Sequence, residues 1–327
     1  MNRSIASAVL ACLVAASPAC KKREKLQPEV VAPTMLAVEI EVALRWTRLP
    51  EAKHRTAALA ILAQLATAPI DRVTRGRLID RTRAMAVETD SNVVEGAFEV
   101  LRVVEPDDYI ENVFEAATSG PAGSRRAAAA HLAKVATPAL ADRITKLLAA
   151  SMTDPLLGDH RMLLVIAVEK APHADATPHL TAALAIAKTD WDREKIAQVL
   201  AVCGASLAEL VTASAYLTND SQHPYGRVAI VMRLGARGDH SHTEFVVAHL
   251  DSQHESLRVA AVRALGQLRD PAAAPALLRR FGLVERGTNE ARALEAVLRN
   301  FPKVRWNRAG PQVEASNATP PKPELIP

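Results

Sequence analysis

A repeat of about 32 residues constrains this chain more than any other feature of its sequence. The Arg-Val-Ala segment at residues 227–229 recurs 31 residues later at 258–260, and Gly235 recurs as Gly266 at the same interval. Looser copies precede them, so that the units begin near Arg55, Val93, Arg125, Arg161, Arg193, Arg227 and Arg258. A fixed period of 20–50 residues is typical of a solenoid or another repeat array.

Each unit contains helices. In the clearest unit, apolar residues follow a helical stripe, namely Leu257, Ala260, Ala261, Ala264, Leu265 and Leu268. Asp270 can cap a second helix that has Pro271 at its first position and is expected over residues 272–281. Alanine supplies 62 of the 327 residues and aromatics only 3%, which favours closely packed helices.

These patterns predict an all-α fold, an α-solenoid of about seven to eight helix pairs over residues 35–301. A helix without a partner is expected at the front, over residues 35–48, and a degenerate last helix over residues 289–301. The interval from Arg55 to Val93 is 38 residues, which predicts a longer loop or helix in that unit.

The block of residues 257–271, with Ala-Pro-Ala-Leu at 274–277 after it, resembles a HEAT-like repeat of the variety also seen in phycobilin lyases. The resemblance implies paired antiparallel helices whose neighbours supply the core, and a long surface that suits a protein or peptide partner. A chaperone of a bilin chromophore is another function that the resemblance allows, but the export signal described next disfavours it.

The first nineteen residues have the three-part pattern of a secretory signal peptide. Residues 1–3 are a basic start, residues 5–16 are mostly apolar, and small residues precede Cys20. The segment Ser-Pro-Ala-Cys at 17–20 resembles a bacterial lipobox, in which the cysteine is lipidated. We therefore expect a lipoprotein of the bacterial cell envelope, anchored through Cys20 and facing the periplasm or the cell surface. Plain secretion with cleavage after Ala19 is the alternative.

The positive charge of the chain lies at its two ends. Residues 1–30 carry a net +3 and residues 302–327 a net +2, whereas the remainder, with 31 basic and 32 acidic residues, is nearly neutral. We expect residues 20–34 to be a flexible tether and residues 302–327 a proline-rich disordered tail. HEAT-like DNA glycosylases exist, but a nearly neutral array lacks the basic surface that binds a duplex, so no nucleic-acid partner is expected.

One segment of the array is rich in arginine and is a candidate partner surface. The candidates are Arg72, Arg75, Arg77 and Arg81, with Arg83 after them, on one predicted helix. An acidic stretch at residues 105–115 follows in the next unit. The functional interpretation is a docking surface for a protein or for lipid headgroups. The structural interpretation is a solvated face whose charges pair between adjacent layers.

Residues that could carry chemistry are sparse. His240 and His242 lie in an inter-helix turn beside acidic residues and are weak candidates for a metal site, with polar turn residues as the alternative. Cys203 lies on an apolar stripe, which favours a buried small residue over a reactive thiol. We expect no cofactor and no catalytic residues. The predicted function is a lipid-anchored scaffold that binds a protein or peptide, and the alternative is an enzyme or metal-binding domain on the same scaffold.

Overall fold

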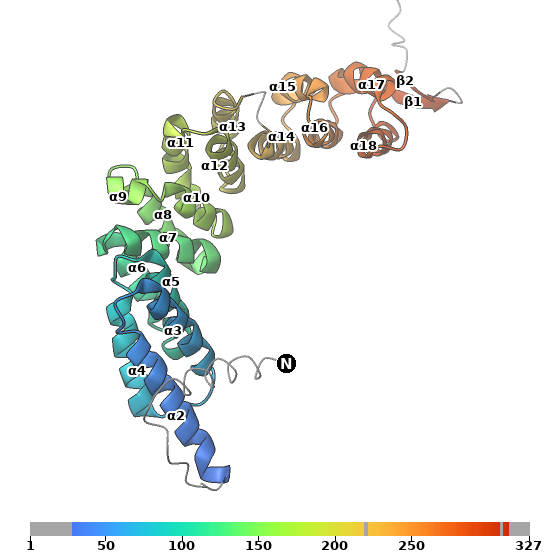
Figure 1. Cartoon of the computed structure of the whole chain (residues 1–327). Helices are drawn as coiled ribbons and strands as arrows, with labels where there is room; N and C mark the ends of the chain where they lie inside the picture. Colours follow the sequence, from blue (N-terminus) through green and yellow to red (C-terminus); the bar gives the residue numbers. More distant parts are fainter. Residues whose placement is uncertain (1–27, 219–221, 308–309, 314–327) are drawn as a thin grey trace, which may run out of the picture. The chain divides into compact units, whose positions relative to one another are not determined.

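The computed structural model describes residues 28–218, 222–307 and 310–313, and side chains from Met35 onward (Figure 1). The chain divides into two compact units, with the boundary between Ala171 and Pro172. This boundary lies inside the region, residues 35–301, that the sequence assigns to the repeat array.

Unit 1 is a stack of helices in two rows. Row A contains helices that pack successively against one another: α3 (Ala52–Leu65), α5 (Ser91–Val104), α7 (Ala122–Val135) and α10 (Arg161–Lys170). Row B contains α2 (Pro28–Trp46), α4 (Arg72–Met85), α6 (Tyr109–Ser119), the 3-10 turn η1 (Pro138–Leu140), α8 (Ala141–Ala150) and the short α9 (Pro155–Gly158).

Unit 2 has the same arrangement. Its row A contains α12 (Asp190–Val202), α14 (Tyr225–Arg237), α16 (Glu255–Leu268) and α18 (Asn289–Leu298). Its row B contains η2 (Ala174–Ala176), α11 (Thr177–Ile186), α13 (Leu207–Ser214), η3 (His240–His242), α15 (Thr243–Val247), η4 (Ala248–Asp251), η5 (Pro271–Ala273) and α17 (Ala274–Leu283). Two short strands follow, β1 (Val304–Asn307) and β2 (Gly310–Val313).

The predicted all-α repeat fold is confirmed. All seven residues that mark the starts of the repeats lie on row A helices, near their N-terminal ends. The longer interval before Val93 has a structural cause, because α4 has 14 residues whereas α6 has 11 and α8 has 10.

The core of each unit lies between its rows, where the apolar stripes of the helices meet. The stripe of α16 shows this, since Leu257, Ala261 and Leu265 are all buried. The predicted cap is also present, because a carboxylate oxygen of Asp270 accepts a hydrogen bond from the backbone N–H of Ala272. Asp239 makes the same bond to Ser241 one repeat earlier, so the spacing of the aspartates reflects a repeated turn.

Three boundaries differ from the predictions. Helix α2 begins at Pro28, so part of the expected tether of residues 20–34 is helical, and α18 ends at Leu298 rather than near residue 301. The prediction of disorder from residue 302 onward is wrong for β1 and β2, which pair in antiparallel fashion. The hairpin is held by Trp306, whose ring packs edge-on against Phe281 at 5.9 Å and lies 5.3 Å from the guanidinium carbon of Arg299.

Several predictions concern residues outside the described part of the chain. The signal peptide, Cys20 and residues 314–327 all belong to this group. Of the helices that are described, none is both long and apolar enough to cross a membrane.

Candidate functional site

A groove between α16 and α18 is the candidate binding site in unit 2. It consists of two adjoining depressions of about 390 and 340 Å³ that share Arg263, Ala296 and Val297. The complete lining is Met232, Arg263, Gly266, Gln267, Arg269, Asn289, Arg292, Ala293, Ala296, Val297, Asn300 and Phe301. The lining therefore combines apolar residues with three arginines, Arg263, Arg269 and Arg292.

Gly266 explains how α16 and α18 come close enough to form this groove. A Cβ atom at this position would lie 2.7 Å from Cγ2 of Val297, which is closer than two carbon atoms can approach. Gly235 has the same role one repeat earlier, where a Cβ would lie 2.5 Å from Cα of Ala264. The 31-residue interval between these glycines thus marks the close contacts between successive row A helices.

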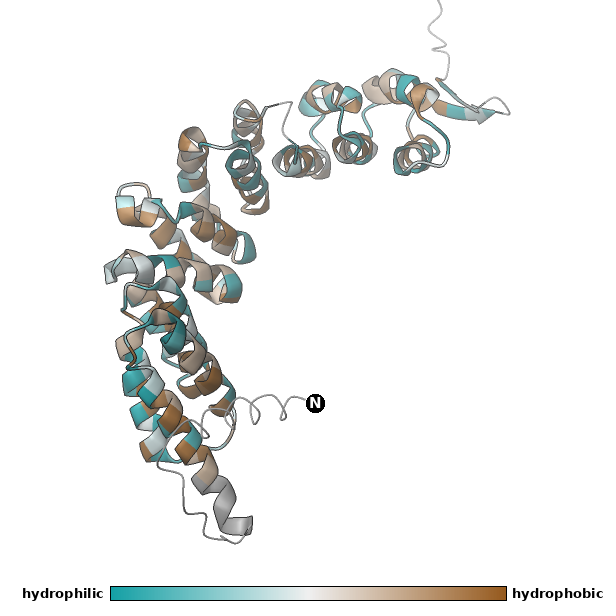
Figure 2. Ribbon diagram, viewed as in Figure 1, coloured by the Kyte–Doolittle hydropathy of each residue, from teal (hydrophilic) through white to brown (hydrophobic). Residues whose placement is uncertain are grey.

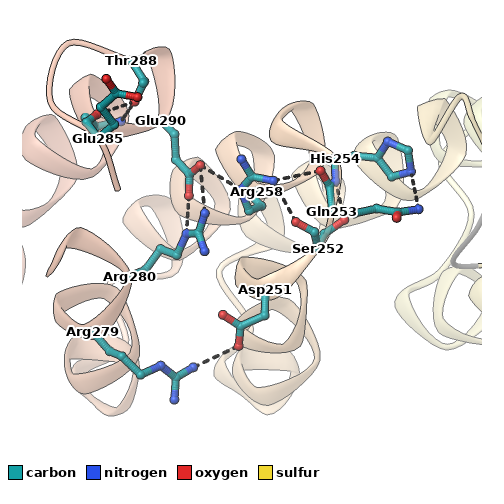
Figure 3. A network of polar contacts seen from close by, with 11 residues as sticks. Asp251, Ser252, Gln253, His254, Arg258, Arg279, Arg280, Glu285, Thr288 and Glu290 are labelled. Atoms are coloured by element: carbon teal, nitrogen blue, oxygen red, sulfur yellow. Dashed lines mark hydrogen bonds and ion pairs between the residues drawn. The ribbon is translucent and has the colours of Figure 1, made fainter. Parts of the chain in front are cut away.

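A buried carboxylate holds α18 in place beside the groove (Figure 3). Glu290 is 1% exposed, and its Oε2 atom accepts a hydrogen bond from Nε of Arg258 on α16 at 2.7 Å. Arg280 on α17 donates to both oxygens of the same carboxylate. Burial raises the pKa of Glu290, but the hydrogen bonds from Arg280 and Arg258 outweigh this effect and hold the pKa below its ordinary value.

Arg258 shows why arginine marks the start of a repeat. Besides Glu290, its guanidinium donates to the backbone carbonyls of Ser252 and Gln253, which precede α16. In unit 1, Arg55 donates to the two carbonyls before α3 and pairs with Glu88. These repeat arginines have a structural role, because they join the turn before their own helix to an acidic residue of the next layer.

Two of the three arginines that line the groove differ from the repeat arginines, because they have no partner among the described residues. Arg263 and Arg269 are exposed, and neither side chain makes a hydrogen bond or ion pair with another described residue. Arg292 donates to the side chain of Asn289 at 2.7 Å, and Glu295 pairs with Arg299 outside the lining. The groove therefore presents unpaired guanidinium groups beside apolar surface, a combination that fits a chain segment carrying both carboxylate and apolar side chains.

The backbone of Arg269 distinguishes this groove from the preceding repeat. Arg269 follows the last residue of α16 with a φ of 54°, in the left-handed region that favours glycine. The corresponding position 31 residues earlier is Gly238, with a φ of 71°. An arginine in this conformation costs about 1 kcal/mol relative to glycine, and such strain occurs preferentially at functional sites.

This groove could not be predicted from the sequence. Arg263 and Arg269 were part of the best repeat block, but the helical pattern alone does not show that Val297 and Ala296 of α18 lie beside them. One signal was present in the sequence, because the repeat places Arg269 where the preceding unit has Gly238.

The predicted arginine surface on α4 is only partly available to a partner. Arg72 and Arg75 are exposed, and neither makes a side-chain bond to another described residue. Arg77 pairs with Glu41 of α2 at 2.6 Å, and Nε of Arg81 donates to Oγ1 of Thr47 at 2.9 Å. Arg83 also pairs, with Glu105 of the next layer. Pairing between layers therefore accounts for Arg77, Arg81 and Arg83, and leaves Arg72 and Arg75.

The histidine pair does not form a metal site with other described residues. Nε2 of His240 lies 2.9 Å from the backbone oxygen of Leu268, and Nε2 of His242 lies 4.0 Å from a carboxylate oxygen of Asp239. Within the described ranges, no three His, Cys, Asp or Glu residues are grouped so that they could hold a metal ion. His240 instead links the turn before α15 to the end of α16.

Cys203 is buried, at 6% exposure, as expected for a small core residue. Burial raises the pKa of its thiol, and a hydrogen bond from the backbone of His173 opposes this only in part. The thiol therefore lacks both the access and the low pKa of a reactive nucleophile.

Comparisons with known proteins agree with this architecture. A model of HEAT repeats matches residues 213–297, a range that includes most of the groove. A solved structure of an engineered protein is similar to 80% of this chain over 78% of its own length, with 15% identity and a TM-score of 0.52, which is a likeness of fold. No curated protein sequence matches the chain.

Two further solved structures show weaker likeness. Human deoxyhypusine hydroxylase in complex with glycerol aligns with 83% of this chain and 98% of its own, at 16% identity and a TM-score of 0.33. The complex of CpcE and CpcF of phycocyanin lyase from Nostoc aligns with 86% of this chain and 97% of that chain, at 13% identity and a TM-score of 0.36.

Proposed function

The chain is a HEAT-like repeat protein, and we propose that it is a binding scaffold whose α16–α18 groove receives a peptide segment of a protein partner. Recognition is by surface complementarity and involves no catalysis. The segment lays apolar side chains against Ala296 and Val297 and directs carboxylates to Arg263 and Arg269.

The conformation of Arg269 is the observation that carries this proposal. A glycine would be less strained at this position, as Gly238 is in the preceding repeat. Keeping an exposed arginine there costs stability, and the side chain makes no hydrogen bond or ion pair with a described residue that would return that stability. A role in binding a partner explains why the position is not glycine.

The variant Arg269→Gly tests this role, because stability and binding should move in opposite directions. We expect the free energy of unfolding to rise by about 0.5–1 kcal/mol as the left-handed strain is relieved. We expect binding to a peptide identified as described next to weaken by about tenfold, as for the loss of one charge-assisted contact. Unchanged binding in a stabilised Arg269→Gly protein would refute the assignment of the groove.

The partner can be identified by placing a photo-crosslinking amino acid at Gln267, an exposed residue of the groove. The matched control is Ala182 on α11, which is also exposed in unit 2 but lies outside the lining. Crosslinking in cells should capture a protein from position 267 and not from position 182. The crosslinked peptide should contain Asp, Glu or a terminal carboxylate together with apolar residues.

We further propose that the scaffold is lipid-anchored and extracytoplasmic, through Cys20 in the bacterial cell envelope. The support is the pattern of residues 1–20, which resembles a signal peptide that ends in a lipobox. Mass spectrometry of the N-terminal peptide from native membranes should find an acylated Cys20. The protein from cells fed a labelled fatty acid should carry the label, and the Cys20→Ala variant should not. An unmodified cysteine, or a protein that begins with residue 20 and carries no lipid, would favour simple secretion instead.

A further inference from the structure

Helix α2 has two apolar stripes on opposite faces, and other described residues bury only one of them. The first stripe packs into unit 1 and consists of Ile40, Ala43 and Leu44, all buried. The second follows the spacing i, i+3, i+7 through Met35, Val38 and Val42 and ends in the exposed Leu49 after the helix. Met35 is 52% exposed and Val38 is 54% exposed. Hydrophobic residues recur along α2 in Figure 2, as is typical of a helix that is covered on more than one side.

The start of α4 adds to this exposed surface. Arg77 contacts Glu41, and Arg81, four residues later on α4, contacts Thr47, which is also later in the chain. Because both partners advance together along the sequence, α2 and α4 run parallel where they meet. Their N-terminal ends therefore lie at the same end of unit 1. Val73, in the first turn of α4, is 72% exposed at that end.

Arginines surround this apolar surface. Arg45 and Arg48 belong to α2 and the turn after it, and Arg72 and Arg75 belong to the start of α4; all four are exposed. None of these four side chains makes an ion pair or hydrogen bond with the described residues. Of the acidic neighbours, Glu51 pairs with Lys53 and Asp71 caps α4, which leaves Glu39 of α2 as one carboxylate among four unpaired arginines.

We propose that this surface, composed of Met35, Val38, Leu49 and Val73 with Arg45, Arg48, Arg72 and Arg75, rests on the anionic face of a lipid bilayer. Apolar side chains enter the interface between headgroups and acyl chains, and the arginines contact lipid phosphates. The stripe from residue 35 to residue 49 spans roughly 20 Å, at 1.5 Å per residue, so the helix lies along the membrane rather than across it.

The length of the preceding chain supports this occupant. The proposal rests in part on the lipid anchor proposed above, since only seven residues separate Cys20 from Pro28 and the eight steps between their Cα atoms span at most about 29 Å. An anchored chain therefore keeps the first turn of α2 near the bilayer, and Lys21, Lys22, Arg23 and Lys25 in this interval carry the same sign of charge. A second copy of the chain fits less well, because a symmetric contact through this surface would bring its unpaired arginines together.

The test places an environment-sensitive dye on the stripe of the full-length protein as the cell processes it. The variant Met35→Cys is labelled at residue 35, while the buried Cys203 reacts poorly. The control is Ala182→Cys on α11. Each protein is incorporated into vesicles of phosphatidylglycerol or of phosphatidylcholine. For the dye at residue 35 in phosphatidylglycerol vesicles, we expect a blue shift of the emission and quenching by brominated acyl chains. We expect neither effect for the same dye in phosphatidylcholine vesicles, nor for the dye at residue 182.

A charge-reversed protein, Arg72→Glu with Arg75→Glu, should lose most of this shift. An unchanged emission of the residue 35 dye in phosphatidylglycerol vesicles would overturn the proposal. A blue shift that occurs without lipid and grows with protein concentration would also overturn the proposal, because that result would show that a second copy of the chain covers the surface. Val38→Cys repeats the measurement if Met35→Cys folds poorly.

The same samples separate this proposal from that of the anchor. Mass spectrometry of the N-terminal peptide reports acylation of Cys20 independently of the dye. If Cys20 carries no lipid, its thiol is removed by Cys20→Ser, and the labelled protein added to preformed phosphatidylglycerol vesicles should still show the shift at residue 35. An acylated protein whose dye does not respond would leave the anchor intact and refute the membrane surface of α2.

Discussion

Helices α2 and α18 are the first and last helices of the described chain, and their exposed faces differ in chemistry. The exposed positions of α18 and its C-cap include Arg292 and Arg299, which bond to Asn289 and Glu295 of the helix. The exposed face of α2 presents Met35 and Val38, with unpaired arginines around them. A terminal repeat normally has a polar outer face, because no further repeat covers it.

This difference indicates what each end of the repeat protein contacts. Helix α18 has the polar face that water requires, and the hairpin β1–β2 packs near it through Trp306. Helix α2 retains the apolar face of a helix inside a stack, so its exposed side is suited to a surface other than water. The predictions below test how far the two ends differ in the forces that hold them.

The largest effect is expected at the α18 end, for Glu290→Ala. Removing this carboxylate leaves Arg258 and Arg280, both less than a fifth exposed, without their acidic partner. We expect the free energy of unfolding to fall by about 3 kcal/mol, because one partner of a buried charge pair is lost. Denaturant unfolding measures it, and a loss below about 1 kcal/mol would show that α18 is held mainly by apolar packing.

Alanine at two glycines should change stability in opposite directions. At Gly266, the added Cβ would lie 2.7 Å from Val297, and we expect a loss of about 1–3 kcal/mol from overpacking between α16 and α18. At Gly76, on α4 beside α2, nothing lies within 4 Å, and we expect a gain of about 0.5–1 kcal/mol from helix propensity. Thermal unfolding of both variants checks this; equal effects would mean that α16 and α18 are not in close contact.

Acid should distinguish His131 in unit 1 from Glu290 in unit 2. Burial lowers the pKa of His131, and Glu99, whose Oε1 atom lies 3.8 Å from Nδ1 of the ring, opposes this only in part. The folded protein therefore binds a proton at His131 less readily than the unfolded chain, whose histidine has a pKa of about 6.5. Stability from the neutral ring is present above that pH and is lost as the pH falls below it.

We therefore expect the stability of His131→Phe relative to the wild type to improve between pH 7 and pH 5.5. The pKa of Glu290 is lowered, so its contribution persists above the ordinary carboxyl range and is lost only in stronger acid. The effect of Glu290→Ala should therefore be the same at pH 7 and pH 5.5. Urea unfolding at both values gives the comparison, and a constant difference for His131→Phe would contradict it.

The smallest effect is expected at the α2 end, for Glu41→Gln. In its ion pair with Arg77, the Glu41 side chain is 33% exposed and the Arg77 side chain 56% exposed, so water screens the pair in part. We expect a loss of less than about 1 kcal/mol, which decreases further in high salt. A loss as large as that of Glu290→Ala would show that the two ends of the chain are held by charge pairs of equal strength.

Much of the fold could be predicted from the sequence because the repeat expresses local physics. The stripe of Leu257, Ala261 and Leu265 and the cap at Asp270 depend on neighbours in the same segment, and the structure contains both. The hairpin at residues 304–313 could not be predicted in this way. It lies in a segment, residues 302–327, that holds six prolines, and its position depends on the contact of Trp306 with Phe281 of α17, which no local pattern reveals.

The candidate site was less predictable than the fold. Four arginines of α4 were expected to act together, but Arg77 and Arg81 bond to residues of α2 and its following turn, about 35 positions away in the sequence. The groove depends on two helices at once, since Arg263 lies on α16 and Ala296 on α18. Charge density along one helix does not reveal which charges a neighbouring layer neutralises.

The repeat arginines also affect how the protein folds during its synthesis. Arg55 with Glu88, Arg125 with Asp154 and Arg258 with Glu290 each connect residues only 29 to 33 positions apart. A layer can therefore be completed as soon as about thirty further residues emerge from the ribosome. At any moment of synthesis, the growing chain needs to shield only the apolar face of its most recent layer.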